Sequence, residues 1–294
     1  MYSHNINVFI DTQNKINNIP ALRELTDNAI NNTYIIDEGF VSKKNKSECH
    51  YADFEENLSL ITAKKFIKKG CRTAVLNFAN PFRPGGGVEC GANAQEEYLC
   101  RATNLYNCLT AKHVYPYYEY HNMLMNKNSN TNAFLGTDKI IYSPNVTIIK
   151  KDINYIAGTD CIPQQIYTEQ WYKVDIITCA APYFSDNSML LSDGDLFHLF
   201  KRRIKNIFEA AIENEIDVLV AGAFGCGAFH NPPDLVAFAF REVFSNPRYK
   251  GAFDLIFAVK RSGYYSKNIE AFDSVFSHYP QTILSMEGIK RNSK

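Results

Sequence analysis

The chain alternates short apolar segments, rich in β-branched residues, with amphipathic segments of helical period, and this alternation most limits its fold. The apolar segments lack polar residues at alternate positions, which indicates strands buried on both faces. Such a sheet needs helices on each side, so the pattern predicts an α/β fold. Strands are expected at 73–78, 140–143, 146–150, 174–179, 217–221 and 253–259, and helices at 20–31, 58–69, about 95–109, 195–214, 232–244 and 269–276.

Two stretches show no clear period. Residues 40–57 are polar and are predicted to form a loop, and the Tyr- and Asn-rich residues 111–138 are predicted to form a long excursion. The chain contains no internal repeat and no low-complexity linker, so one domain is favoured over two.

The composition excludes several classes of protein. Hydrophobic residues make up 46% of the 294 residues, which is enough for a large core and argues against a disordered chain. The 31 Lys and Arg residues balance 31 Asp and Glu residues, and this zero net charge argues against a protein that coats long nucleic acid. A local anion site stays possible, because backbone N–H groups alone can build one.

The sequence carries no sign of a membrane partner or of a metal. It has no uninterrupted apolar stretch of about 18 residues, and its N-terminus does not resemble a signal peptide, so a soluble cytoplasmic protein is expected, or a nuclear one in a eukaryote. The eight cysteines form no C-x-x-C pair and no zinc-like cluster. They are therefore expected to be reduced core residues, with neither a metal nor a cofactor bound.

Two glycine clusters, each between a predicted strand and a predicted helix, are the first candidates for a binding site. One is Pro84–Val88 and the other is Gly222–Phe229. Ligands of α/β sheets bind at the carboxyl ends of strands, where glycines admit a phosphate and the next helix supplies partial positive charge. The alternative is that these glycines only make turns. Neither cluster matches GxxxxGK[ST], GxGxxG or GxSxG, which excludes a Walker-type ATPase and an ordinary dinucleotide dehydrogenase.

Gln95, Glu96 and Glu97 follow the first cluster and are the candidate reactive residues. Carboxylates in the first turn of a helix are also common for dipole reasons alone. Adjacent helical residues point about 100° apart, so the two glutamates are not expected to aim at one atom. They should therefore have different functions, one orienting a hydroxyl group while the other moves a proton.

The triple glycine 85–87, a short spacer and Gln95-Glu96-Glu97 resemble the signature of poly(ADP-ribose) glycohydrolases, and the surrounding residues 77–106 resemble the microbial-type branch. The second cluster resembles the diphosphate loop of that branch, and the resemblance covers roughly residues 70–280. It implies a macrodomain-like mixed β-sheet sandwiched between helices. Residues 1–69 would be an N-terminal helical extension of the same domain, and residues 70–294 the catalytic domain. Asn77 stands where the animal enzymes carry Asp.

The family's residue roles carry over by position. Glu97 would be the catalytic acid/base, and Glu96 and Asn80 would bind the ribose beside the scissile bond. Further substrate contacts would come from both loops and from the residue before the glutamate pair. These implied contacts are Gly85, Gly86, Gly87, Val88, Gln95, Ala223, Phe224, Gly225, Cys226, Gly227, Ala228 and Phe229, with Phe229 packed against the proximal ribose.

The implied reaction is hydrolysis of a ribosyl–ribose O-glycosidic bond in poly(ADP-ribose), with ADP-ribose released from the chain end. Departure of the leaving hydroxyl needs a proton, so the hypothesis is that protonated Glu97 donates it and then activates water. The expected partners are poly(ADP-ribose), ADP-ribose and ADP-ribosylated proteins, and the protein is expected to be a monomer.

Two other functions stay open at this point. A macrodomain can bind ADP-ribose without cleaving it, although a pure reader does not require Glu96-Glu97. The chain could also be a hydrolase for mono-ADP-ribosylated proteins or another conjugate, because loop shape decides the acceptor. Segments 113–121 and 260–265 are where that choice is expected to be made, unless their tyrosines simply cover the core.

Overall fold

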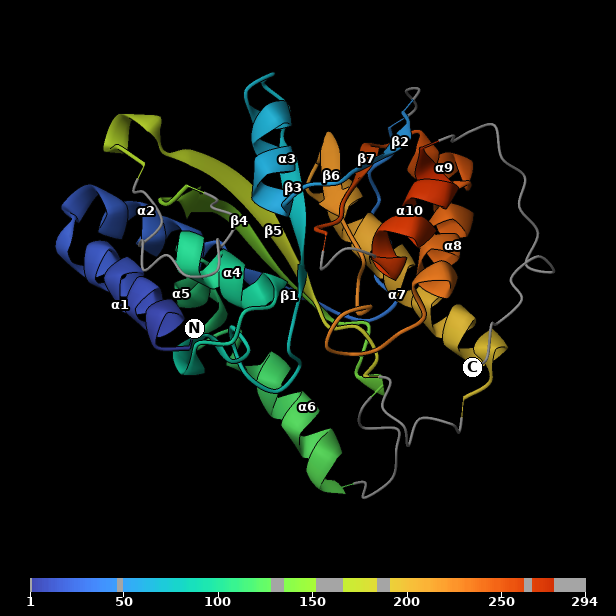
Figure 1. Cartoon of the computed structure of the whole chain (residues 1–294), viewed down its shortest axis with the longest axis horizontal. Coiled ribbons are helices and arrows are strands. Elements are labelled where there is room, and N and C mark those ends of the chain that lie inside the picture. The colour runs from blue at the N-terminus through green and yellow to red at the C-terminus, as the bar shows by residue number, and fades with distance from the viewer. Residues whose placement is uncertain are drawn as a thin grey trace.

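The fold comes from a computed structural model that describes residues 2–46, 50–127, 135–151, 166–183, 191–261 and 266–277. Its centre is a seven-stranded mixed sheet in the order β1-β4-β5-β3-β6-β7-β2 (Figure 1). Strands β5, β3, β6, β7 and β2 run parallel, while β1 and β4 are antiparallel to their neighbours. The strands are β1 (Tyr34–Ile36), β2 (Ala52–Glu55), β3 (Thr73–Phe78), β4 (Ile140–Ile148), β5 (Tyr172–Cys179), β6 (Val218–Ala221) and β7 (Asp254–Ala258).

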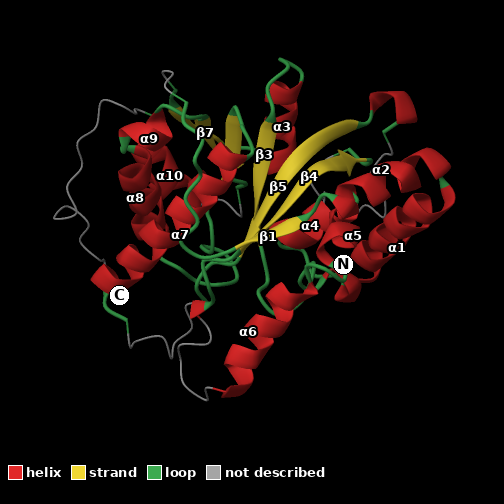
Figure 2. Cartoon of the chain, turned by 180° about the vertical axis from the view of Figure 1, so that it is seen from behind, coloured by secondary structure: helices red, strands yellow, loops and turns green. Residues whose placement is uncertain are grey.

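Helices cover both faces of this sheet, as the strand pattern predicts (Figure 2). One core packs α7, α8 and α10 against the sheet, and a second core packs the N-terminal helices and α3 to α6 against the other face. The helices are α1 (Tyr2–Asn18), α2 (Pro20–Asn31), α3 (Ser59–Ile67), the 3-10 turn η1 (Val88–Cys90), α4 (Gln95–Ala102), α5 (Leu105–Leu109), α6 (Tyr115–Lys127), the 3-10 turn η3 (Thr168–Gln170), α7 (Asp193–Glu213), α8 (Pro233–Phe244), α9 (Pro247–Lys250) and α10 (Lys267–Phe276).

The prediction of a loop over 40–57 was wrong, because this stretch contains β2. Among the described strands, β2 pairs with β7 alone and lies at an edge of the sheet, where a polar sequence is common. The prediction of an irregular excursion over 111–138 was also wrong, since α6 fills much of it. Tyr117 and Tyr118 are both buried although they are adjacent, which hides any helical period.

Two further boundaries differ from the predictions. The helix expected at about 95–109 ends at Ala102 and restarts at Leu105, because Thr103 is extended and its hydroxyl accepts a hydrogen bond from the Leu105 N–H at 3.0 Å. The two strands expected at 140–143 and 146–150 are one strand, β4, which is bulged between Ser143 and Val146. The break at Thr103 limits α4 to Gln95–Ala102, with Gln95, Glu96 and Glu97 in its first turn.

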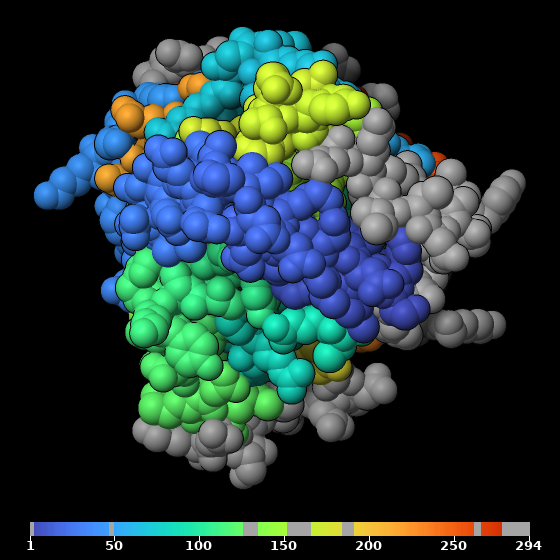
Figure 3. Space-filling model, turned by 90° about the vertical axis from the view of Figure 1, so that its left-hand side faces the viewer, coloured from blue at the N-terminus to red at the C-terminus, as the bar shows by residue number. Residues whose placement is uncertain are grey.

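Residues 1–69 supply more than helices. They form α1, α2 and α3, and also β1 and β2, which are the two edges of the sheet. In Figure 3 the blue N-terminal helices lie as a band beside the teal segment that leads into α4. The division into an extension and a catalytic domain stays a prediction. Within the described residues, no helix is both long and apolar enough to cross a membrane.

Candidate active site

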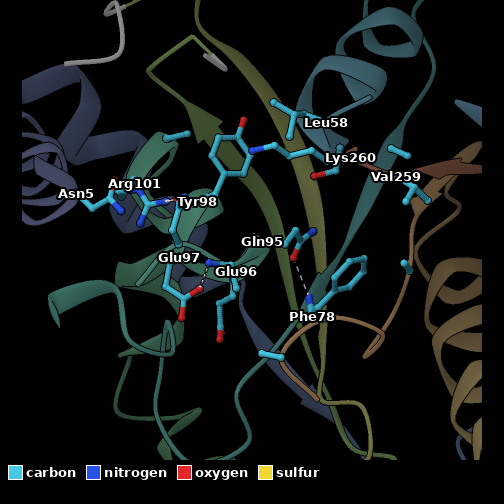
Figure 4. Close-up of a pocket in the computed structure, with 18 of the residues that line it drawn as sticks. Asn5, Leu58, Phe78, Gln95, Glu96, Glu97, Tyr98, Arg101, Val259 and Lys260 are labelled. Atoms are coloured by element: carbon cyan, nitrogen blue, oxygen red, sulfur yellow. Dashed lines mark hydrogen bonds between the residues drawn. The ribbon is translucent and has the colours of Figure 1, made fainter. Parts of the chain in front are cut away.

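The site lies where β3 and β6 stop pairing. The ladder between these parallel strands ends at Val75, three residues before β3 itself ends. The carboxamide of Gln95 then takes the place of the neighbouring strand. Its Nε2 donates to the Leu76 carbonyl at 2.8 Å, and its Oε1 accepts from the Phe78 N–H at 3.0 Å (Figure 4). This side chain joins the start of α4 to β3 and leaves a crevice at the carboxyl ends of the strands.

Glu96 is buried and points to the turn after β3. Its Oε2 accepts the Asn80 N–H at 2.7 Å, and its Oε1 accepts from the Asn77 amide at 3.3 Å. Burial is the main cause that raises the pKa of Glu96 to about 8, and the neighbouring Glu97 carboxylate adds to the effect. Glu96 is therefore mostly protonated at neutral pH and can donate a hydrogen bond as well as accept one.

Glu97 is held by the two backbone segments on either side of the spacer. Its Oε1 accepts the Gly87 N–H at 2.9 Å, and its Oε2 accepts the Ala94 N–H at 2.9 Å in a capping interaction. The expectation that the two glutamates would not aim at one point was wrong. A Cβ atom built on Gly86 would lie 2.5 Å from Glu97 Oε1 and 3.0 Å from Glu96 Oε2. Both carboxyl groups thus converge on this glycine, because the loop folds back between them.

The second glycine loop follows β6 and is held by the side chain of Asn231, a residue that the sequence analysis did not single out. The buried Asn231 donates from Nδ2 to the Pro182 carbonyl at 2.7 Å and to the Gly225 carbonyl at 2.9 Å. Gly225 has a φ of 75°, a conformation that favours glycine. Phe229 is half-buried at the outer end of the loop, where its ring contacts that of Tyr183.

The two loops border one cavity of about 660 Å³. Of the predicted substrate contacts, seven line it: Asn80, Gln95, Ala223, Gly225, Gly227, Ala228 and Phe229, together with both glutamates. Four predicted contacts in the first loop do not line the cavity: Gly85, Gly86, Gly87 and Val88. Phe224 packs into the core against Phe78, and the Cys226 thiol is directed to the Phe224 carbonyl, so these two residues do not line it either.

The cavity continues well past the predicted residues. Beyond Gln95 it is lined by Asn57, Leu58, Val259 and Lys260, from the loops after β2 and β7. On the α1 side it is lined by His4, Asn5, Arg101 and Lys151. Of these residues, Arg101 falls in the segment 77–106 and Lys260 in the segment 260–265, both of which the sequence analysis had singled out. Residues 262–265 lie outside the described residues.

Arg101 fixes the spacer between the glycines and the glutamates. Its guanidinium donates to the Ala92 carbonyl at 2.6 Å and to Asn93 Oδ1 at 2.6 Å. From the other side, the amide of the buried Asn5 donates to the Gly91 carbonyl at 2.9 Å. This role of Arg101 could hardly be predicted from the sequence, because a basic residue one turn after a carboxylate more often forms an ion pair on the surface of a helix.

The described residues contain no group of three His, Cys, Asp or Glu side chains placed to hold a metal ion. Six cysteines are described, and each is a free thiol, with Cys100, Cys108 and Cys179 buried as predicted and Cys90 exposed. Cys49 and Cys161 lie outside the described residues.

Comparison with known proteins gives a family match and several similar solved structures. Residues 8–151 match the model of the microbial-type PARG catalytic domain, where PARG is poly(ADP-ribose) glycohydrolase. The chain is similar to the PARG of Thermomonospora curvata, with 25% identity over 92% of this chain and 99% of that one and a TM-score of 0.79. It is also similar to the Deinococcus radiodurans PARG in complex with ADP-ribose, with 28% identity over 85% and 96% of the two chains and a TM-score of 0.72. No curated protein sequence matches the chain significantly.

Proposed function

Because this chain belongs to the microbial-type poly(ADP-ribose) glycohydrolase family, we propose that it hydrolyses the ribosyl–ribose O-glycosidic bond of poly(ADP-ribose) with Glu97 as acid/base. One observation carries the assignment of the acid. Glu97 is held by two backbone N–H groups at the start of α4, beside a second buried carboxyl group and on the wall of the cavity. A proton donor so placed can reach the leaving oxygen of a sugar bound between the two loops.

The cavity accommodates one ADP-ribose unit from its Leu58 end to its glutamate end. The second loop, with Gly225, Gly227 and Ala228 on the wall, is the seat of the diphosphate, because N–H groups and small residues let phosphate oxygens approach the backbone. Asn57, Leu58 and Lys260 then surround the adenosine end. The distal ribose reaches Asn80 and the two glutamates.

Glu96 and Glu97 have different roles in this arrangement. The protonated Glu96 donates a hydrogen bond to a hydroxyl of the distal ribose, and its neutral state places no negative charge beside the Glu97 proton donor. Glu97 gives its proton to the departing hydroxyl oxygen while the C–O bond breaks. It then takes a proton from the water that attacks the oxocarbenium-like ribose. The products are free ADP-ribose and a polymer shortened by one unit, which is exo-cleavage.

The test is the variant Glu97→Gln, with Glu89→Gln as its matched control. Glu89 lies in the same loop, but its carboxylate accepts from the Tyr106 hydroxyl at 2.8 Å and does not line the cavity. Release of ADP-ribose from polymer should fall by about 10²–10⁴-fold in Glu97→Gln only, with ADP-ribose affinity by calorimetry retained. Turnover close to that of the wild type in Glu97→Gln would remove it from the mechanism. Release only from mono-ADP-ribosylated protein, or tight binding with no release by the wild type, would replace the proposed activity.

A further inference from the structure

We propose that the α1 side of the cavity is a second subsite, which binds the diphosphate of the polymer unit on the leaving-group side of the scissile bond. This inference rests on the proposed function and deepens it. The subsite is the part of the cavity lined by His4, Asn5, Asn93, Arg101 and Lys151. In Figure 4, Asn5 and Arg101 lie on one side of Tyr98, while Leu58 and Lys260 lie on the other.

The position of the acid gives the direction of the leaving chain. Glu97 must contact the leaving oxygen, and its Oε2 is bound to the N–H of Ala94, the residue next to Asn93. The ADP-ribose unit that is released occupies the other direction, toward the second loop and Leu58. The chain that departs therefore begins beside the α1 side of the cavity.

The walls of the subsite are fixed within the fold. Asn5 and Arg101 hold the spacer, as described above, and Lys150 ties α1 to the end of β4. The Nζ of this buried lysine donates to the Val8 carbonyl at 2.7 Å and to Thr12 Oγ1 at 2.6 Å, and it pairs with Asp11 at 2.9 Å. No rearrangement of α1 is needed to form the subsite.

The charge of the subsite suits a diphosphate. Among all the described residues that line the cavity, only Glu96 and Glu97 are acidic. Lys151 is exposed at the α1 side of the cavity. Lys151 also lies within electrostatic reach of Lys64 of α3, since it contributes, after burial and Lys68, to lowering the pKa of Lys64. Arg101 and Lys151 both line this end of the cavity, and their positive charges attract a multivalent anion, which each polymer unit carries.

The experiment compares Lys151→Ala, Lys151→Glu and the conservative Lys151→Arg with the control Lys205→Ala. Lys205 is an exposed lysine of α7, on the opposite face of the sheet. The KM for long poly(ADP-ribose) should rise about three- to five-fold in Lys151→Ala, further in Lys151→Glu, and little in Lys151→Arg. The slope of log KM against log salt should weaken by about 0.7 in Lys151→Ala. The Kd for ADP-ribose alone should not change.

Two outcomes would overturn the subsite: an unchanged polymer KM in Lys151→Glu, or an equal loss of affinity for ADP-ribose alone. Binding of polymer to Glu97→Gln, with and without Lys151→Ala, is measured in parallel by fluorescence anisotropy. That measurement needs no turnover, so it tests the subsite even if the wild type releases no ADP-ribose, an outcome that would refute the proposed function alone. Equal polymer binding by these two variants would refute the subsite alone.

Discussion

Replacing Gly86 by Ala tests whether the convergence of the two glutamates on the first loop determines turnover. Gly86 has a φ of 59°, and a Cβ there would lie 2.5 Å from Glu97 Oε1, which is closer than any relaxed contact. The methyl group must therefore push the Glu97 carboxylate away from the Gly87 N–H. The left-handed backbone costs about 1–2 kcal/mol and loss of the charged hydrogen bond about 1.5–3 kcal/mol. We expect the free energy of unfolding to fall by about 2.5–5 kcal/mol.

The effect on the rate should exceed the effect on stability. A displacement of about 1 Å at a reacting group can lower the rate about 100-fold, so kcat for release of ADP-ribose should fall at least that far. The assay is release of ADP-ribose from polymer at saturating concentration, with thermal unfolding measured on the same samples. Any loss of activity at temperatures where Gly86→Ala is fully folded then reports the site and not the stability.

The control is Gly39→Ala, which separates backbone strain from displacement of the carboxylate. Gly39 has a φ of 70°, but a Cβ there would meet no atom within 4 Å. This variant should lose only about 1–2 kcal/mol of stability and keep its kcat. If Gly86→Ala kept the kcat of the wild type, then either Glu97 does not occupy the described position or it does not transfer the proton. Equal kcat losses in both variants would show that strain alone, at any turn, impairs the enzyme.

Three further predictions concern the groups around the site. Folding raises the pKa of Glu96 from 4.5 to about 8, so its contribution to stability is full below pH 4.5 and is lost as pH rises through 8. Glu96→Gln should therefore flatten the pH dependence of thermal unfolding between pH 4.5 and 8. An unchanged curve would contradict the raised pKa. Arg101→Met should lower kcat with little change in ADP-ribose affinity. Arg101→Lys should recover only part of the lost kcat, because a lysine cannot make both contacts with the spacer. Full recovery of kcat in Arg101→Lys would mean that charge alone matters. Asn231→Ala should instead weaken ADP-ribose binding by about 1–3 kcal/mol in calorimetry, because the second loop loses its two hydrogen bonds to this side chain. A loss of kcat at unchanged affinity would refute the role of Asn231 in ADP-ribose binding.

The elements that the sequence predicted best are those whose own residues decide them. Helix α2 begins at Pro20, a residue that suits the first turn of a helix. Strand β3 spans the predicted residues 73–78, because a short apolar segment of this kind is typical of a strand that is buried on both faces. Strand β2 could not be predicted in this way. Its four residues pair with β7, from a distant part of the chain, and the pairing decides their conformation.

The site was predictable in its parts but not in its geometry. Two glycine loops and a glutamate pair could be found from residue types and spacing, and the structure brings them to one cavity. The convergence of the Glu96 and Glu97 carboxyl groups on Gly86 could not be predicted. The prediction used only the angle between neighbouring residues of a helix, and the sequence does not show that the first loop returns between the two side chains. Asn231 and Arg101 act on backbone carbonyls, and such contacts leave no pattern in the sequence.

The zero net charge of the chain is compatible with binding a polyanion, because the charges are separated in space. Several acidic side chains that are buried or half-buried pair with basic side chains inside the fold. Asp138 pairs with Arg203, Glu209 pairs with Arg248, and Asp11 pairs with Lys150. The positive charge of each pair is offset by its acidic partner, whereas Lys151 is exposed at the edge of the cavity. Polymer binding should thus weaken with salt as if only a few phosphates were neutralised, since in the proposed binding mode the second loop contacts a diphosphate through uncharged N–H groups.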